Sequence, residues 1–387
     1  MIKKKYTLRL ISTIIITVLL SGCTGNLDDS PAPGLGNGWE IERSMELEYA
    51  ENFKVDYYPG GYDLITISDR SRFLVIPPNA EVPENIDEDI IILQQPLNNI
   101  YLVATSAMGV FDALGSLENI SLSGTKAKDW YIDNARTAME AGDILYAGKY
   151  SAPDYELIID SGCKLAIQST MINHVPEVKE KLEYIGIPVL IDQSSYEAHP
   201  LARTEWIKLY GVLMGKEDIA EKIFAEQRDY MNEVISKENT GKTVAFFYIS
   251  SSGHAVARKS GDYVTKMIML AGGNYIFKDL GDSKTANSAV ILEMEEFYAT
   301  AREADIIIYN STIGGEVYSI EELILKNKLL EDFKAVKNGD VWCTGKNLYQ
   351  ETTQLGLMIA DIHQLLTEND ENLTQLNFIY KLPKTTP

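Results

Sequence analysis

Two kinds of hydrophobic pattern divide the chain. Between residues 40 and 104 the apolar positions come in short runs, at 62–68, 72–76, 89–93 and 101–104, and a polar turn joins the first two. Short apolar runs bounded by turn residues are typical of β-strands, and two such runs across a short polar turn predict a hairpin. We therefore expect a β-rich start, to which the sequence alone assigns no role.

Beyond residue 105 short apolar runs alternate with segments of helical periodicity. We expect strands at 119–122, 143–147, 164–168 and 187–191, and helices at 106–115, 126–141, 153–161 and 176–185. Regular alternation of strand and helix predicts a mostly parallel sheet with helices on both faces.

Two helical segments, 200–214 and 217–237, follow and are parted at Gly215. The second has no internal glycine or proline, and at 1.5 Å per residue it would span roughly 30 Å, about the width of one lobe. A second alternating set comes after it, with strands at 243–250, 305–309 and 341–343 and helices at 262–271, 293–303, 320–326 and 352–366. The pattern predicts an N-terminal lobe over 40–216, a bridging helix over 217–238 and a C-terminal lobe over 239–387.

The first residues indicate export. A basic start is followed by the apolar run 10–20, which is of signal-peptide length and too short to span a bilayer. The run ends in Leu20-Ser21-Gly22-Cys23, which resembles the lipobox of bacterial lipoproteins. We expect a signal peptide over 1–22, lipidation at Cys23, and a flexible tether over 23–39 that is rich in Gly, Pro, Asp and Asn. The alternative is a plain secretory signal in which Cys23 is incidental.

Composition and charge narrow the partners. The chain is 45% hydrophobic and 24% charged, which is ordinary for a globular protein, and its formal net charge is −21. Because such a surface repels polyanions, we expect no nucleic-acid partner. Three cysteines are too few for a disulfide framework, and the four histidines have no metal-ligand spacing, so we expect no metal held directly by the protein.

One arrangement occurs in both halves: acidic residues stand at the start of a helix that runs into a buried strand. The acids are Asp154 and Glu156 before strand 164–168, and Glu293, Glu295 and Glu296 before strand 305–309. The chain also has the lipobox, a long mid-chain helix behind 200–208 and a turn at 272–274. In this order these features resemble the substrate-binding lipoproteins of ATP-driven importers, in the class for ferric siderophores, haem and cobalamin. The resemblance covers about residues 99–366. The start over 40–98 departs from it, being longer and more β-rich than is usual.

The resemblance implies two α/β lobes bridged by one long helix, with the ligand in the cleft between them and no enzymatic activity. The cargo would be a small-molecule metal complex, and no cofactor is expected. We expect a monomer, lipid-anchored on the outer face of the bacterial cytoplasmic membrane, that delivers its cargo to an ABC permease. In the family one glutamate per lobe docks on a permease arginine; these would be Glu156 and Glu293, with Glu295 as a rival for the second. Acids in a first helical turn also stabilise the helix dipole, which is the structural alternative.

Ligands of open α/β sheets bind beyond the carboxyl ends of the strands. A cleft there lined by aromatic and hydroxyl groups suits a large planar or macrocyclic ligand. The candidate ligand-binding residues are Trp130, Tyr131, Tyr150, Thr170, Met171, Tyr196, Ser251, His254, Asn310 and Tyr349. Lys149 and Lys346 could grip an anionic ligand. Helix caps and core packing are the structural alternatives for most of these side chains.

Two other classes stay open. A zinc- or manganese-binding importer lipoprotein has a similar two-lobed build, but it needs several histidines and carboxylates around one ion. A surface-anchored hydrolase is the other alternative, although the chain has no Gly-x-Ser-x-Gly, no His-Glu-x-x-His and no P-loop. Whether the ligand is a siderophore, haem or a corrinoid is not decided by the sequence.

Overall fold

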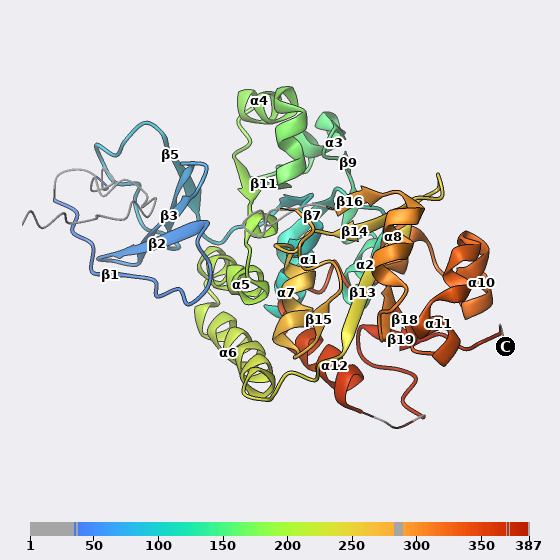
Figure 1. The fold of residues 1–387 in the computed structure, drawn as a ribbon. Coiled ribbons are helices and arrows are strands. Elements are labelled where there is room, and N and C mark those ends of the chain that lie inside the picture. The colour runs from blue at the N-terminus through green and yellow to red at the C-terminus, as the bar shows by residue number, and fades with distance from the viewer. Residues whose placement is uncertain (1–34, 36–37, 282–288, 369, 371, 386–387) are drawn as a thin grey trace, which may run out of the picture.

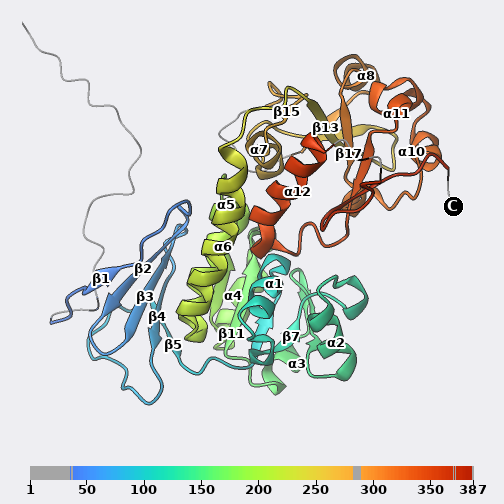
Figure 2. The same cartoon turned by 90° about the horizontal axis from the view of Figure 1, so that it is seen from below.

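In a computed structural model that describes residues 35, 38–281, 289–368, 370 and 372–385, three β-sheet bodies surround a central group of helices (Figure 1). The N-terminal sheet and the first lobe lie on opposite sides of helices α5 and α6, and the second lobe lies at the far end of these helices (Figure 2). The two-lobed α/β fold is therefore as predicted, with the β-rich start as a body of its own.

The N-terminal sheet has five strands in sequence order, all neighbours antiparallel except the last pair, β4 and β5, which is parallel. Its strands are β1 (Arg43–Ser44), β2 (Phe53–Tyr58), β3 (Tyr62–Ile67), β4 (Arg72–Ile76) and β5 (Ile90–Gln94). The predicted hairpin is the β3–β4 pair. Alternate side chains such as Val55 and Ile65 join the core that continues into the helices, while Leu64 and Leu74 form a small separate core on the outer face, beneath Leu35.

The first lobe has a five-stranded parallel sheet in the order β12-β11-β6-β7-β8. Its strands are β6 (Ile100–Leu102), β7 (Ile120–Ser123), β8 (Leu145–Tyr146), β11 (Leu165–Ser169) and β12 (Val189–Asp192), and a short β9–β10 ribbon (Gly148–Lys149, Ala152–Pro153) stands apart. Its helices are α1 (Thr105–Ala113), α2 (Asp133–Ala141), α3 (Tyr155–Asp160) and α4 (Pro176–Tyr184). The predicted helix 126–141 is broken, because a 3-10 turn at Ala127–Asp129 precedes α2.

Two consecutive helices, α5 (Pro200–Met214) and α6 (Glu217–Ile235), lead from the first lobe to the second. They part at Gly215, as predicted, and this glycine closes α5 in the left-handed conformation with φ 63°. Every residue of α5 except the last is buried, because the N-terminal sheet, the first lobe and neighbouring helices enclose it. At 1.5 Å per residue α6 is about 28 Å long, and one of its faces stays in solvent.

The second lobe has a seven-stranded sheet in the order β16-β14-β13-β17-β18-β19, with β15 also paired to β13. Its strands are β13 (Thr243–Ile249), β14 (Ala255–Arg258), β15 (Asn274–Tyr275), β16 (Ala289–Leu292), β17 (Ile306–Tyr309), β18 (Val341–Thr344) and β19 (Ile379–Lys381). The central strands are parallel, whereas β14 and β19 run antiparallel to them, β14 because a tight turn after β13 folds the chain straight back. The edge strand β16 pairs antiparallel with β14 and so has the direction of the central strands again.

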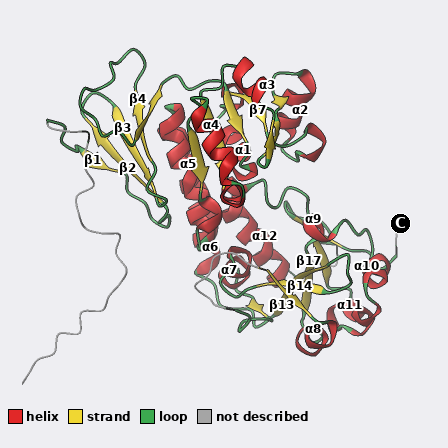
Figure 3. Ribbon diagram, turned by 90° about the horizontal axis from the view of Figure 1, so that it is seen from above, coloured by secondary structure: helices red, strands yellow, loops and turns green. Residues whose placement is uncertain are grey.

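Helices cover both faces of this second sheet (Figure 3). They are α7 (Tyr263–Leu270), α8 (Met294–Ala301), α9 (Ser311–Gly314), α10 (Ile320–Lys326), α11 (Lys334–Asn338) and α12 (Leu355–Thr367). Helix α12 also packs along α6, and Gly356 allows this close approach: a Cβ atom there would lie 1.9 Å from the backbone oxygen of Gln227. The second lobe therefore rests directly on the connecting helix.

Candidate functional site

Three polar side chains of the second lobe, each just after or at the end of a strand, lie together. The hydroxyl oxygen of Tyr349 accepts hydrogen bonds from the guanidinium of Arg258 at 2.7 Å and from the side-chain amide of Asn310 at 2.8 Å. Asn310 follows β17, Tyr349 follows β18 and Arg258 ends β14. The side-chain oxygen Oδ1 of Asn310 is buried and has no hydrogen-bond partner among the described residues. A buried acceptor without a partner is costly, so this oxygen is available to a donor group or a water.

Arg258 is held from a second side by Asp262, whose carboxylate lies 3.4 Å from the guanidinium. Burial disfavours the charged form of Arg258, but Tyr349 and Asp262 outweigh it and raise the pKa of the arginine. Burial raises the pKa of Tyr349, and Arg258 acts against that rise. The arginine therefore keeps its charge although only 14% of its side chain is exposed.

A second guanidinium lies between the lobes. Arg203, on buried helix α5, donates to the backbone oxygens of Ser195 at 2.6 Å and Glu197 at 3.2 Å, in the first lobe. Its guanidinium also stacks over the ring of Tyr263 in the second lobe, 3.8 Å from the ring centroid. Stacked arginines of this kind interact favourably with the negative face of the ring. The inter-lobe region thus holds two arginines in a chain that is otherwise strongly acidic.

The first lobe contributes four of the predicted residues to its strand ends. Tyr131 is half-buried, with Lys346 of the second lobe 5.5 Å from its ring centroid. Thr170 shares a hydrogen bond with Ser195, with 3.3 Å between the two hydroxyl oxygens. Met171 and Tyr196 stand nearby in sequence and are 44% and 46% exposed. These apolar surfaces are free to contact a ligand.

Two predicted residues lie elsewhere. Trp130 is 1% exposed, packs in the main core, and donates its indole N–H to the hydroxyl of Ser123 at 3.2 Å. This placement differs from the expectation, because a fully enclosed indole offers no surface to a ligand. Tyr150 is partly buried against the second core cluster of the first lobe. Both aromatics serve packing here.

The turn between β13 and β14 carries Ser251 and His254. Ser251 is exposed at its tip, and the ring of His254 lies with Nδ1 3.0 Å from the hydroxyl of Ser252. Its Nε2 lies 3.6 Å from a carboxylate oxygen of Glu293, a docking candidate at the start of α8. This histidine therefore faces the rim of the second lobe, apart from the Arg258–Tyr349 pair.

The docking candidates are all exposed. Glu156 stands in the first turn of α3, Glu293 is the N-cap residue of α8 with 75% of its side chain exposed, and Glu295 follows in the first turn of that helix. Their exposure is what docking on a permease requires, and their place in a first helical turn also stabilises the helix dipole. Cys23, the predicted lipidation site, lies outside the described residues, as do the signal peptide and most of the tether.

The predicted lysines differ in their surroundings. Lys149 is exposed on the short β9–β10 ribbon. Lys346 is bound to Glu316 at 2.7 Å, so much of its charge is already neutralised. Among the described residues no group of three or more His, Cys, Asp or Glu side chains is placed to hold a metal ion.

Sequence reasoning missed Arg258 as a site residue. Arg258 directly follows the apolar run 255–257, and a charged residue at the end of a buried strand is the sequence feature that could have marked it as a site residue. Its role depends on Tyr349, 91 positions further along the chain, and this pairing follows from the fold.

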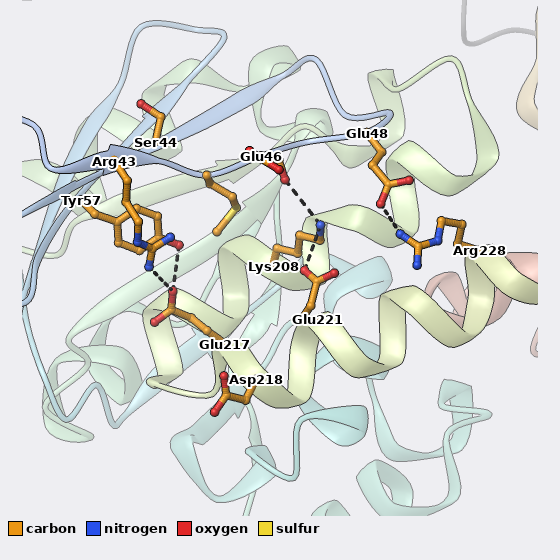
Figure 4. Close-up of a pocket in the computed structure, with 11 residues that line it drawn as sticks. Arg43, Ser44, Glu46, Glu48, Tyr57, Lys208, Glu217, Asp218, Glu221 and Arg228 are labelled. Atoms are coloured by element: carbon orange, nitrogen blue, oxygen red, sulfur yellow. Dashed lines mark hydrogen bonds and ion pairs between the residues drawn. The ribbon is translucent and has the colours of Figure 1, made fainter.

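A pocket of about 620 Å³ lies away from this region, between the N-terminal sheet and α6 (Figure 4). Its charged side chains bind one another: Arg228 pairs with Glu48, and Lys208 lies 3.0 Å from Glu221. The hydroxyl of Tyr57 donates to Glu217 at 2.8 Å. Because these cations are satisfied by neighbouring acids, the pocket joins the sheet to the helix and is not our candidate ligand site.

Comparisons with known proteins agree with this architecture. The family model described as "Periplasmic binding protein" matches residues 100–348 and begins just after the N-terminal sheet. The match covers more than half of the chain, which therefore belongs to the periplasmic binding protein family. Members of this family bind solutes rather than act as enzymes, and in general they work with an ABC permease. The resemblance inferred from the sequence is confirmed at this level.

Similar proteins extend the match. An uncharacterized lipoprotein of Methanocaldococcus jannaschii is 26% identical over 425 residues, and the alignment covers 95% of this chain and 97% of that protein. A periplasmic haem-binding protein of Vibrio cholerae matches with a TM-score of 0.56 and 16% identity, over 70% of this chain and 99% of that one. The petrobactin-binding protein of Bacillus subtilis matches with a TM-score of 0.56 and 14% identity, over 71% and 94%. At these identities the two solved structures establish the shared fold. Within the part of the chain that the structure describes, no helix has both the length and the apolarity needed to cross a bilayer.

Proposed function

We propose that this protein is the extracytoplasmic, lipid-anchored binding component of an ABC importer, and that its cargo is an anionic iron complex. A ferric siderophore with carboxylate or catecholate groups, or haem with its propionates, would fit. The observation that carries the proposal is the charged guanidinium of Arg258 in a strongly acidic chain. Arg203, which is 8% exposed and bound to two backbone oxygens, adds a second positive charge near it. Guanidinium groups bind planar oxyanions through paired N–H donors, which a lysine cannot do.

The surroundings of Arg258 support the same ligand chemistry. Tyr349 and Asp262 orient the guanidinium, and 14% of the Arg258 side chain stays exposed. Thr170 and Ser195 offer hydroxyls from the facing lobe, and Tyr196 offers an exposed ring. Such a mixture of fixed charge, hydroxyl and aromatic surface suits a large ligand with anionic groups.

The comparisons support this class of cargo. Solved structures with the same fold include proteins described as binding haem or petrobactin. The relative from Methanocaldococcus jannaschii is described as a lipoprotein, which supports lipidation at Cys23 and a place on the outer face of the membrane.

The direct test is a titration of the chain from Thr24 onward, followed by absorption and tryptophan quenching. The panel is haem, a ferric catecholate siderophore, a ferric hydroxamate siderophore, cobalamin, Zn²⁺ and Mn²⁺. We expect saturable one-to-one binding of haem or the ferric catecholate, and at least tenfold weaker binding after Arg258→Ala, which removes charge-assisted hydrogen bonds of about 1.5–3 kcal/mol each. Binding of cobalamin or of a bare metal ion alone would contradict the proposal. Turnover of a bound ester would favour the hydrolase instead.

Delivery to a permease is the second part of the proposal. Exposed acids against arginines suit reversible docking, because the pair forms without a large desolvation cost at the rim. Replacing both Glu156 and Glu293 by Ala should leave ligand affinity unchanged and abolish uptake in cells that carry the cognate permease. Glu180→Ala, an exposed acid on α4, is the matched control and should transport normally. Loss of ligand affinity in the double variant would place these acids in the binding site. Substituting Glu295 separately decides between the two candidates on α8.

A further inference from the structure

A four-residue segment between β18 and α12, Tyr349 to Thr352, binds both lobes; we call it the strap. On the second-lobe side, the hydroxyl of Tyr349 is bound by Arg258 and Asn310. At the other end, the hydroxyl of Thr352 donates to the backbone oxygen of Ser106 in the first lobe at 2.8 Å. The strap is thus a further contact between the lobes, besides the helices α5 and α6 and the stacking of Arg203 on Tyr263.

Gln350 is the central link of the strap to the first lobe. Its side-chain Nε2 donates to the backbone oxygen of Asp129 at 2.9 Å, and its Oε1 accepts from the backbone N–H of Tyr131 at 2.8 Å. Both ends of the amide are therefore used on one loop of the first lobe. A shorter side chain could not reach both partners, and a carboxylate could not donate to the oxygen of Asp129.

The backbone of the strap is also held closely. A Cβ atom on Gly109 of α1 would lie 2.7 Å from the backbone oxygen of Gln350, so this glycine makes room for the strap. Lys346, just before the strap, lies over the ring of Tyr131. The strap therefore has backbone and side-chain contacts to the first lobe within one residue of Tyr349.

We propose that Gln350 is a positioning residue that sets the orientation of the two lobes around the ligand site. Tyr349 of the strap binds Arg258 of the candidate site, and the next residue, Gln350, binds the first lobe. Holding the lobes in one arrangement before the ligand arrives raises the binding-competent fraction, and apparent affinity rises in proportion to that fraction. The link to affinity rests on the function proposed above, whereas the effect on lobe orientation does not.

The test compares Gln350→Ala with Gln354→Ala. Gln354 is a glutamine a few residues further on. Among the described residues its side chain bonds only to Glu351, in its own segment, so it is a matched control. Spin labels would be placed at Glu140 on α2 and Glu321 on α10, both exposed, after substitution by Cys and with Cys163 changed to Ser. The distance distribution between the labels is then measured in the ligand-free protein.

We expect one narrow distribution in the parent protein and in Gln354→Ala, and a broader or longer one in Gln350→Ala. Gln350→Glu, which keeps the acceptor and loses the donor, should fall between them. An unchanged distribution in Gln350→Ala would overturn the proposal, whatever the ligand is. Melting curves of the variants check that each remains folded.

A second readout uses whichever of haem or the ferric catecholate siderophore binds the parent protein. Loss of the two bonds should weaken that binding by about tenfold, with little change in Gln354→Ala. Failure of both probes to bind would contradict the proposed cargo and leave the distance measurement to decide the role of Gln350.

Discussion

Buried carboxylates help to attach the N-terminal sheet to the helices: Glu197 accepts the backbone N–H groups of Glu51 and Asn52, and Glu205 on α5 accepts those of the preceding residues. Removing the charge of Glu205 gives a sharp prediction. Glu205 is fully buried and accepts the backbone N–H groups of Glu48, Tyr49 and Ala50, each at 2.8 Å. One of its oxygens also lies 3.3 Å from the ammonium of Lys208. Glu205→Gln keeps the shape of the side chain but turns one acceptor oxygen into a donor group.

The cost follows from these contacts. The amide oxygen of Gln can keep at most two of the three N–H groups, and a buried N–H without a partner costs about 1–3 kcal/mol. The two remaining hydrogen bonds lose their charge assistance, and Lys208 loses a buried partner. Breaking a buried charge pair by removing one partner typically costs about 3–5 kcal/mol. We expect this loss to fall on the contact between segment 45–52 and the helix.

Hydrogen–deuterium exchange of peptides within 45–58 measures this local opening. A loss of about 3 kcal/mol should speed their exchange by roughly a hundredfold, while peptides from the second-lobe sheet change little. Glu221→Gln is the control, since Glu221 binds the same Lys208 but is 57% exposed; exposed pairs contribute about 1 kcal/mol or less. Equal effects of the two substitutions, or no effect of Glu205→Gln on 45–58, would refute the reasoning.

Three further predictions concern pH, packing and the site. Burial, and after it Glu217, raises the pKa of Asp63 to about 7, so the folded state keeps a proton that the unfolded state releases near the usual pKa of about 3.9. The free energy of unfolding should therefore fall as the pH rises from about 4 to 7. Asp63→Asn should raise the urea midpoint more at pH 8 than at pH 5. Gly356→Ala places a Cβ 1.9 Å from the backbone oxygen of Gln227 and should lower the melting temperature, because overpacking costs about 1–3 kcal/mol or more; an unchanged melting curve would contradict the packing of α12 on α6. Arg258→Lys keeps the charge but loses the fork of donors, so ligand titration should show weaker binding with little change in thermal stability; unchanged affinity would exclude a guanidinium contact.

Much of the fold followed from local patterns. The strands at 165–169 and 306–309 and the division of the helical segment at Gly215 were predicted within a few residues. These elements depend on periodicity over a few neighbouring positions and on one residue that favours the left-handed conformation. The order lobe, helix, lobe was readable for the same reason. Strands β14 and β19 were missed, since they are short and add to the sheet only through pairing with distant strands.

The site itself was only partly readable. Asn310 and Tyr349 were predicted as candidates because they follow buried strands, which is a local signal, and the structure places their side chains together. Trp130 carries the same signal, yet it is buried, because the neighbouring packing decides which way a loop side chain turns.

Sequence by itself therefore determined the strongly negative net charge, the family and the order of strands and helices, and it predicts an export signal. Only the tertiary structure decided that Arg258 meets Tyr349, that Gln350 bridges to the first lobe, and that Glu205 holds the N-terminal sheet. The physical reason is the range of the interactions: periodicity acts between near neighbours in the chain, whereas a buried charge or amide is satisfied by partners that only the packing of distant segments brings within 3 Å.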